Sequence, residues 1–133
     1  MVSFQQRKSM WIQLGKLCRL FGRQAPWTDY SDGITETEYI RFNSLIETVK
    51  QENGWFTPES VRSALSAWGD ALEADKLEQW LSAYTIADQP AGKTVAVIGA
   101  GNIPFVAMHD ILCAVVSGHR ALVKYASDDR SLI

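Results

Sequence analysis

The chain is poor in the residues that mark several common protein classes. It has two cysteines among 133 residues, too few for a disulfide framework, so we expect a reduced, cytoplasmic setting. Its 13 Lys and Arg residues are outnumbered by 15 Asp and Glu residues, so no surface for nucleic acid is expected. The first fifteen residues also lack the apolar segment of a signal peptide.

The longest apolar stretch is interrupted by polar residues. Residues 94–118 contain no Lys or Arg and are long enough to cross a bilayer. However, Asn102, His109 and Asp110 lie near the middle of this stretch, where a buried acid costs roughly 3 kcal/mol. A strand, a turn and a helix of a soluble protein hold the same residues without this cost, so no membrane span is expected.

Apolar residues recur at helical spacing through the first two thirds of the chain. Ser3 and Thr57 are suitable N-caps, and Pro58 suits a first helical turn. Cys18 lies on an apolar stripe and is expected to be a buried, inert thiol. The pattern predicts helices at residues 4–21, 37–51, 58–72 and 74–84.

The pattern changes at residue 91, where strand and helix signals begin to alternate. Residues 94–98 are a short run rich in β-branched residues, which predicts a strand buried on both faces. A glycine turn, a helix at 103–117 and a strand at 120–125 follow, and a further helix is expected to open at Asp129. The predicted class is therefore α/β: a helical region (1–90), then the first βαβ unit of a truncated Rossmann-like domain (91–133).

Two parallel strands bury too little surface to form a complete sheet. We therefore expect residues 91–133 to be the start of a dinucleotide-binding domain whose remainder lies elsewhere. Alternatively, other copies of the chain complete the sheet by pairing with an exposed strand edge, which favours a homo-oligomer.

The turn Gly99-Ala100-Gly101 begins a partial G-x-G-x-x-G motif between a predicted strand and a predicted helix. Pro104 replaces the third glycine. The motif favours a dinucleotide site, while a tight turn without a ligand explains the glycines equally well.

Two further residues near this turn have both a functional and a plain structural interpretation. Asn102 occupies the expected helix N-cap, where its amide would donate to a developing oxyanion or simply cap the helix. Lys124 ends the second strand at the edge where parallel sheets bind ligands, although a solvated lysine is equally expected there. Cys113 lies in the middle of an apolar helix and is expected to be buried and inert. His109 and His119 have no partner at metal-ligand spacing, so no metal site is expected.

The residues from Val95 to Asp128, with the turn Gly101–Pro104 and the strand ending in Lys124, resemble the start of the cofactor domain of aldehyde dehydrogenases. The similarity is greatest to the acyl-CoA reductase branch, which includes the fatty-acid reductase of bacterial bioluminescence. Residues 53–57 and 67–69 of the helical region resemble that branch as well.

This resemblance implies a fragment of a reductase that converts acyl-CoA to fatty aldehyde through a thioester on a Cys outside these residues. The fragment alone would then be inactive. Asn102 would stabilise the oxyanion, and Trp55 and Phe56 are candidates to line an acyl channel. Ser127 stands where the superfamily has a Glu, and the lost negative charge favours NADP(H) over NAD(H). The cofactor would be bound by Gly99, Ala100, Gly101, Lys124 and Ser127.

Two other functions are compatible with the same residues. The chain would be a non-catalytic interaction module if its incomplete sheet served for self-association or for docking on a partner. It would be a small nucleotide-binding protein if the glycine turn bound a cofactor without turnover.

Overall fold

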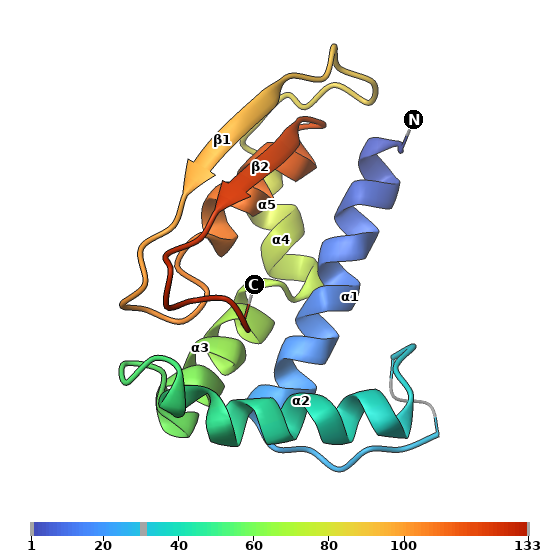
Figure 1. The fold of residues 1–133 in the computed structure, drawn as a ribbon. Helices are drawn as coiled ribbons and strands as arrows, with labels where there is room; N and C mark the ends of the chain where they lie inside the picture. The colour runs from blue at the N-terminus through green and yellow to red at the C-terminus, as the bar shows by residue number, and fades with distance from the viewer. Residues whose placement is uncertain (1, 30–31, 133) are drawn as a thin grey trace.

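The computed structural model describes residues 2–29 and 32–132 as a helical region followed by a small parallel sheet (Figure 1). This mixed helical and parallel-sheet composition, with the predicted order of elements, confirms the α/β expectation at that level. In chain order the elements are α1 (Phe4–Gly22), α2 (Glu36–Thr48), the 3-10 helix η1 (Val49–Gln51), α3 (Pro58–Ala71), α4 (Ala74–Leu81), β1 (Thr94–Ile98), α5 (Met108–Val116) and β2 (Arg120–Lys124).

Helices α1, α2 and α3 begin at side-chain caps. The Ser3 hydroxyl accepts from the backbone N–H of Gln6, and the Gln6 side chain accepts from the Ser3 N–H in return. Thr57 caps α3 in the predicted way by accepting from Ser60, and Pro58 occupies the first turn. The predicted helix starts at these two caps are therefore confirmed.

Helices α1 and α3 approach each other closely because glycines face the partner helix. A Cβ atom on Gly15 would lie 2.7 Å from the Cβ of Leu72, and one on Gly22 would lie 2.5 Å from the backbone nitrogen of Ser66. Gly69 of α3 meets α1 in the same way. The contact is thus one of backbone against backbone, and larger residues would separate the helices.

The core consists of two clusters of buried side chains that both include α1 residues. In one cluster, α1, α2 and α3 pack with Phe105 and Leu132 from the C-terminal part of the chain. In the other, Trp11 of α1 packs with α4 and with Leu112 and Val116 of α5. Helix α5 therefore lies between α1 and the sheet, as Figure 1 shows.

A buried arginine joins α1 to the end of α5. Only 5% of Arg7 is exposed. Its Nε donates to the carbonyl of Val116 at 3.0 Å, and its two Nη atoms donate to the carbonyls of Val2, Ala87 and Asp88 at 2.6–3.0 Å. The guanidinium thus holds α1, the end of α5 and the linker before β1 together.

Strands β1 and β2 pair in parallel, with Thr94 opposite Arg120 and Ile98 opposite Lys124. Helix α5 covers one face of this pair, and Val97 is the buried residue of β1. On the other face Ile98 is 79% exposed and Leu122 is 63% exposed. The expectation of a strand buried on both faces is therefore wrong, because no second layer covers this face among the described residues.

Two predicted helix starts in the C-terminal part are also wrong. Helix α5 begins at Met108, five residues later than expected, because residues 103–107 form turns in which Phe105 has a φ of 59°. This left-handed conformation is incompatible with a helix. No helix is present in residues 129–132; instead the chain turns, and the Asp129 N–H donates to the carbonyl of Ala126 at 3.1 Å.

Replacing Gly22 tests the close contact between α1 and α3. An alanine inside a helix is usually favoured over glycine by about 1 kcal/mol, but here its methyl group has no room beside Ser66. We expect Gly22→Ala to lower the free energy of unfolding by about 2 kcal/mol in urea titrations. Gly54→Ala is the matched control, since a Cβ there meets no atom within 4 Å. Equal stabilities of the two variants would contradict the contact.

Replacing Arg7 tests the junction between the helical region and the βαβ unit. Arg7→Met keeps much of the apolar volume but leaves buried carbonyls without donors, so we expect a loss of about 3 kcal/mol. The control Arg23→Met removes an exposed ion pair with Asp70 and should cost less than about 1 kcal/mol. Thermal unfolding followed by circular dichroism compares the two variants. A loss of stability for Arg7→Met no larger than that for Arg23→Met would show that Arg7 does not join the two regions.

Candidate functional site

The glycine turn leaves β1 at the carboxyl edge of the sheet. The backbone N–H of Gly99 donates to the carbonyl of Lys124 at 2.9 Å, which extends the strand pairing by one bond beyond Ile98. Ala100, Asn102 and Lys124 are exposed at this edge. Ligands of parallel sheets bind at this edge, so the turn and Lys124 share the position expected of a binding site.

A buried asparagine from the helical region holds the turn in place. The Nδ2 of Asn53 donates to the carbonyl of Gly101 at 2.7 Å, and its Oδ1 accepts from the backbone N–H of Trp55 at 3.0 Å. The sequence pattern marked Asn53 only as the end of a helix. Asn53 lies in residues 53–57, which resemble the acyl-CoA reductases. Its polar side chain in that segment was the available sequence signal that it does more than end a helix.

The loop after β2 closes directly on Gly101. A Cβ atom on Gly101 would lie 2.8 Å from the Cβ of Ala126 and would overlap the carboxylate of Asp128. Gly99 has ordinary room instead, since its Cβ would lie 3.5 Å from the nearest side chain, Ala107. Of the two glycines in the motif, Gly101 is therefore the one that the packing requires.

All six predicted site residues lie at this edge, on the turn after β1 or at and after the end of β2. Gly99, Ala100, Gly101 and Asn102 form the turn, while Lys124 ends β2 and exposed Ser127 follows it. The structure thus brings the two predicted groups of residues together. The close approach at Gly101 is made by the Ala126 methyl group and the Asp128 carboxylate of the loop after β2.

The predicted helix cap at Asn102 is wrong. The N-cap of α5 is Ala107, five residues later, and it makes no side-chain hydrogen bond. Asn102 is exposed in the turn, and no hydrogen bond of its side chain is found within the described ranges. Its amide is therefore free to donate to a ligand, but the positive end of the α5 dipole does not lie beside it.

A buried aspartate without a partner lies next to this loop. Asp129 is 2% exposed, and within the described part of the chain neither carboxylate oxygen accepts a hydrogen bond. Burial raises the pKa of Asp129, and the negative charges of Asp128 and Glu52 raise it further. Asp129 was expected to begin a helix, but in the structure it is a buried residue of the loop after β2.

The two thiols are unsuited to nucleophilic catalysis at neutral pH. Cys18 is buried as expected, and burial raises its pKa to about 11. Cys113 is only half-buried, contrary to expectation, and its Sγ lies 3.8 Å from the Nδ1 of His109. Burial and the nearby charge of Asp110 still raise the pKa of Cys113, so the thiol form dominates.

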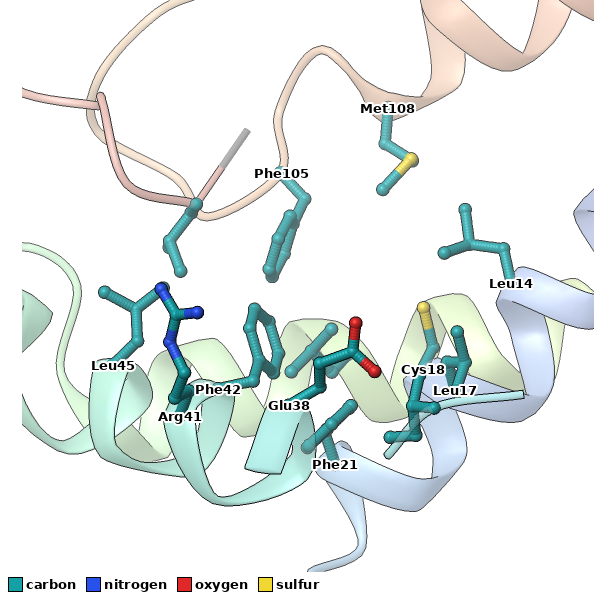
Figure 2. Close-up of a pocket in the computed structure, with 13 residues that line it drawn as sticks. Leu14, Leu17, Cys18, Phe21, Glu38, Arg41, Phe42, Leu45, Phe105 and Met108 are labelled. Carbon is teal, nitrogen blue, oxygen red and sulfur yellow. The ribbon is translucent and has the colours of Figure 1, made fainter. Parts of the chain in front are cut away.

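A cavity of about 630 Å³ opens between α1, α2 and the segment after the glycine turn (Figure 2). Its lining is apolar except for Glu38 and Arg41 of α2, and Figure 2 shows Phe105 and Met108 facing α1 and α2 across it. The apolar lining consists of Leu14, Leu17, Cys18, Phe21, Ile34, Phe42, Leu45, Leu65, Phe105, Met108 and Leu132.

The expected acyl-channel residues do not line this cavity. Trp55 is 70% exposed, and Phe56 is fully buried in the core. Their positions differ because Asn53 turns the chain outward at residue 55 before Phe56 packs inward. Most residues that do line the cavity lie in the predicted helices, although Ile34 lies outside them, and the sequence pattern assigned none of them to a pocket.

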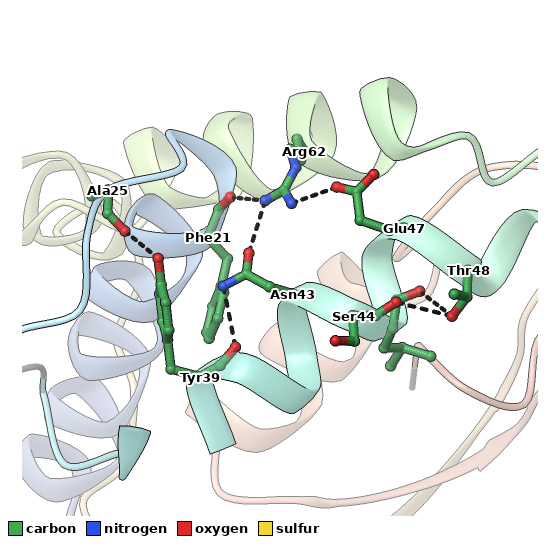
Figure 3. Close-up of polar contacts among 9 residues, drawn as sticks. Phe21, Ala25, Tyr39, Asn43, Ser44, Glu47, Thr48 and Arg62 are labelled. Atoms are coloured by element: carbon green, nitrogen blue, oxygen red, sulfur yellow. Dashed lines mark hydrogen bonds and ion pairs between the residues drawn. The ribbon is translucent and has the colours of Figure 1, made fainter. Parts of the chain in front are cut away.

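Helix α2 forms one wall of the cavity and is held by polar contacts (Figure 3). The Nη1 of Arg62 donates to the carbonyl of Phe21 at 2.8 Å and to the Oδ1 of Asn43 at 3.2 Å, and its Nη2 pairs with Glu47 at 2.7 Å. The hydroxyl of Tyr39 donates to the carbonyl of Ala25 at 2.7 Å. These bonds fix α2 across α1 and α3 without filling the space between them.

No helix in residues 2–29 and 32–132 is long and apolar enough to cross a membrane. No three His, Cys, Asp or Glu side chains in these ranges are grouped as a metal site would require.

The buried Asp129 predicts a particular pH dependence of stability. Above roughly pH 3.9 the acid ionises in the unfolded chain more readily than in the folded one, because its folded pKa is raised. Stability is therefore lost as the pH rises from 4 through the folded pKa. We expect Asp129→Asn to be more stable than the unchanged chain at pH 7, with the difference vanishing below pH 4.

Urea titrations at several pH values test this expectation. Asp75→Asn, which removes an exposed acid on α4, serves as the matched control and should show no such pH-dependent gain. An Asp129→Asn variant that is less stable at pH 7 would show that the buried carboxylate has a stabilising partner.

Comparisons with protein-family models, with curated proteins and with solved structures found no match to this chain. The likeness to acyl-CoA reductases therefore rests on the quoted sequence motifs. The turn, the loop that closes on Gly101 and the apolar cavity are the structural observations on which a function can be proposed.

Proposed function

We propose that this chain is the N-terminal part of an acyl-CoA reductase that converts acyl-CoA to fatty aldehyde with a nicotinamide cofactor. One observation carries the proposal beyond the sequence motifs. Phe105 and Met108, four and seven residues after Gly101, form one side of the 630 Å³ apolar cavity. A nucleotide-type turn and a cavity suited to an aliphatic chain thus share one segment.

The turn supports a cofactor role through its backbone and its exposed side chains. Lys124 offers a cation at the carboxyl edge, and the Asn102 amide offers a donor for an oxyanion. A bound nicotinamide would supply the hydride for the reduction. The preference for NADP(H) expected from Ser127 alone remains a prediction, as do the homo-oligomer and the cytoplasmic setting.

The cavity supports an acyl-chain role through its size and lining. Sites for small molecules typically enclose about 300–1,000 Å³ with mostly apolar walls. Arg41 and Glu38 are both exposed on the cavity lining. Hydrogen bonds from Thr35 lower the pKa of Glu38, and the charge of Arg41 contributes to lowering it, so the two charges offset each other. An aliphatic chain with a polar head therefore matches the apolar walls.

Neither thiol of this chain suits the nucleophilic step of such a reductase, because both have raised pKa values. The thioester would form on a Cys outside these residues. We therefore expect no turnover when the purified chain is mixed with NADPH and a long-chain acyl-CoA, and cysteine-dependent turnover would refute the assignment.

Binding of a fluorescent fatty acid, cis-parinaric acid, tests the cavity directly. We expect Leu45→Trp, which fills the cavity from α2, to weaken binding by about tenfold or more. The control Ile40→Trp adds the same ring at an exposed position of α2 outside the cavity and should bind normally. Circular dichroism verifies that both variants fold. Unchanged binding by Leu45→Trp would exclude the cavity as the acyl site.

A non-catalytic interaction module is the second candidate, and the uncovered face of the sheet favours it. Ile98 and Leu122 expose apolar surface there, and a partner or a second copy would cover it. This alternative predicts self-association or capture of a partner without affinity for fatty acid or nucleotide. Sedimentation analysis together with the fatty-acid titration separates the two candidates.

A further inference from the structure

A polar hollow lies at the starts of β1 and β2, at the edge of the sheet opposite the glycine turn. Figure 1 shows this edge near the N-terminal end of α1. The hollow has a volume of about 300 Å³ and is lined by Gly92, Lys93, Thr94, Gly118, His119 and Arg120. Among the described residues, no Asp or Glu lines it. A hollow with cations and no carboxylate on its walls attracts anions.

The two strands bring four side-chain donors to this hollow in two pairs. Thr94 lies opposite Arg120 in the strand register, so their side chains stand on the same face of the sheet. The backbone N–H of Lys93 donates to the Nδ1 of His119 at 3.4 Å, so the Nε2 of a neutral His119 carries the proton. A hydroxyl, a guanidinium, an ammonium and an imidazole N–H therefore border one hollow.

Three of these side chains have no partner within the protein. Lys93, Thr94 and Arg120 are exposed, and across residues 2–29 and 32–132 their side chains make no hydrogen bond or ion pair. The backbone of the same residues is well held, because the Arg120 N–H donates to the carbonyl of Lys93 at 2.8 Å. Donors that are already unpaired break no contact of the protein when they turn to a ligand.

A buried cation beside the hollow offsets the end of α5. This helix ends at Val116, where its dipole places about half a negative charge. Arg7 donates to the Val116 carbonyl, and a Cβ atom on Gly118 would lie 3.3 Å from the Cζ of Arg7. Within the described ranges every acceptor of Arg7 is a backbone carbonyl, so no carboxylate cancels its full positive charge. The field at the hollow is therefore positive.

A phosphate group matches this set of donors best. It carries a charge of about −1.5 to −2 at pH 7 and three strong acceptor oxygens. Guanidinium and ammonium groups are its usual partners in proteins. A carboxylate has one charge and two oxygens, so it would leave more of the four donors unpaired.

We propose that this hollow binds a phosphate group through Lys93, Thr94, His119 and Arg120. The inference does not depend on the proposed function, because the glycine turn lies at the other edge of the sheet and the apolar cavity lies between α1 and α2. The phosphate belongs either to an inorganic ion or to a nucleotide, such as the phosphate-bearing end of coenzyme A.

Calorimetric titration of the purified chain with pyrophosphate at low ionic strength tests this inference. We expect Lys93→Gln and Arg120→Gln each to weaken binding about tenfold, because each removes a charge-assisted hydrogen bond. Lys50→Gln is the matched control, since it removes an exposed cation of η1 outside the hollow and should bind normally. Thermal melts verify that each variant folds.

Two results would overturn the inference in different ways. Equal weakening by Lys50→Gln and Lys93→Gln would mean that the anion is attracted by general charge, and the absence of pyrophosphate binding would have the same consequence for the site. Neither result touches the proposed function. If Lys124→Gln loses binding while Lys93→Gln keeps it, the anion binds at the glycine turn. The inference then fails, while the proposed cofactor site gains support.

Adenosine 3′,5′-bisphosphate distinguishes the two sources of the phosphate. This probe carries the phosphates of coenzyme A without its acyl arm. If it binds more tightly than pyrophosphate and loses that affinity in Lys93→Gln, the ligand is a nucleotide. If pyrophosphate binds equally well or better and depends on Lys93 and Arg120, the hollow is a site for an inorganic ion.

Discussion

The buried guanidinium of Arg7 is the constraint on which the arrangement of the whole chain depends. It donates to carbonyls from the start of the chain, from the linker before β1 and from the end of α5. A buried cation is costly unless all of these acceptors surround it, so the segments cannot separate without losing several bonds at once. Helix α5 is therefore fixed on α1, and the sheet is fixed on α5.

The carboxyl edge of the sheet is positioned by the same kind of long-range contact. Asn53 reaches the glycine turn, while Phe105 and Leu132 enter the core formed by α1, α2 and α3. The helical region thus contacts the glycine turn through Asn53 and contacts the segments after the turn and after β2 through the core. This arrangement explains why one short segment borders both the exposed edge and the apolar cavity.

Local patterns predicted the elements of this fold, because caps and apolar periodicity act within a few residues. Ser3 and Thr57 begin helices as expected, and the order of strands and helices is correct. The failures have long-range causes: Phe105 turns into the core instead of beginning α5, and Asp129 is buried instead of opening a helix. The predicted site residues gather at one edge, but the role of Asn53 depended on a contact 48 residues away in the chain.

The central claim is that the edge formed by the glycine turn and the loop after β2 binds the adenosine half of a nicotinamide cofactor. Nuclear magnetic resonance of the ¹⁵N-labelled chain titrated with ADP-ribose tests it most directly, since each backbone amide reports on its own surroundings. The account predicts that the largest shifts fall on Gly99, Gly101, Asn102 and the amides of residues 125–128. Shifts confined to the helical region, or no shifts at millimolar ligand, would contradict it.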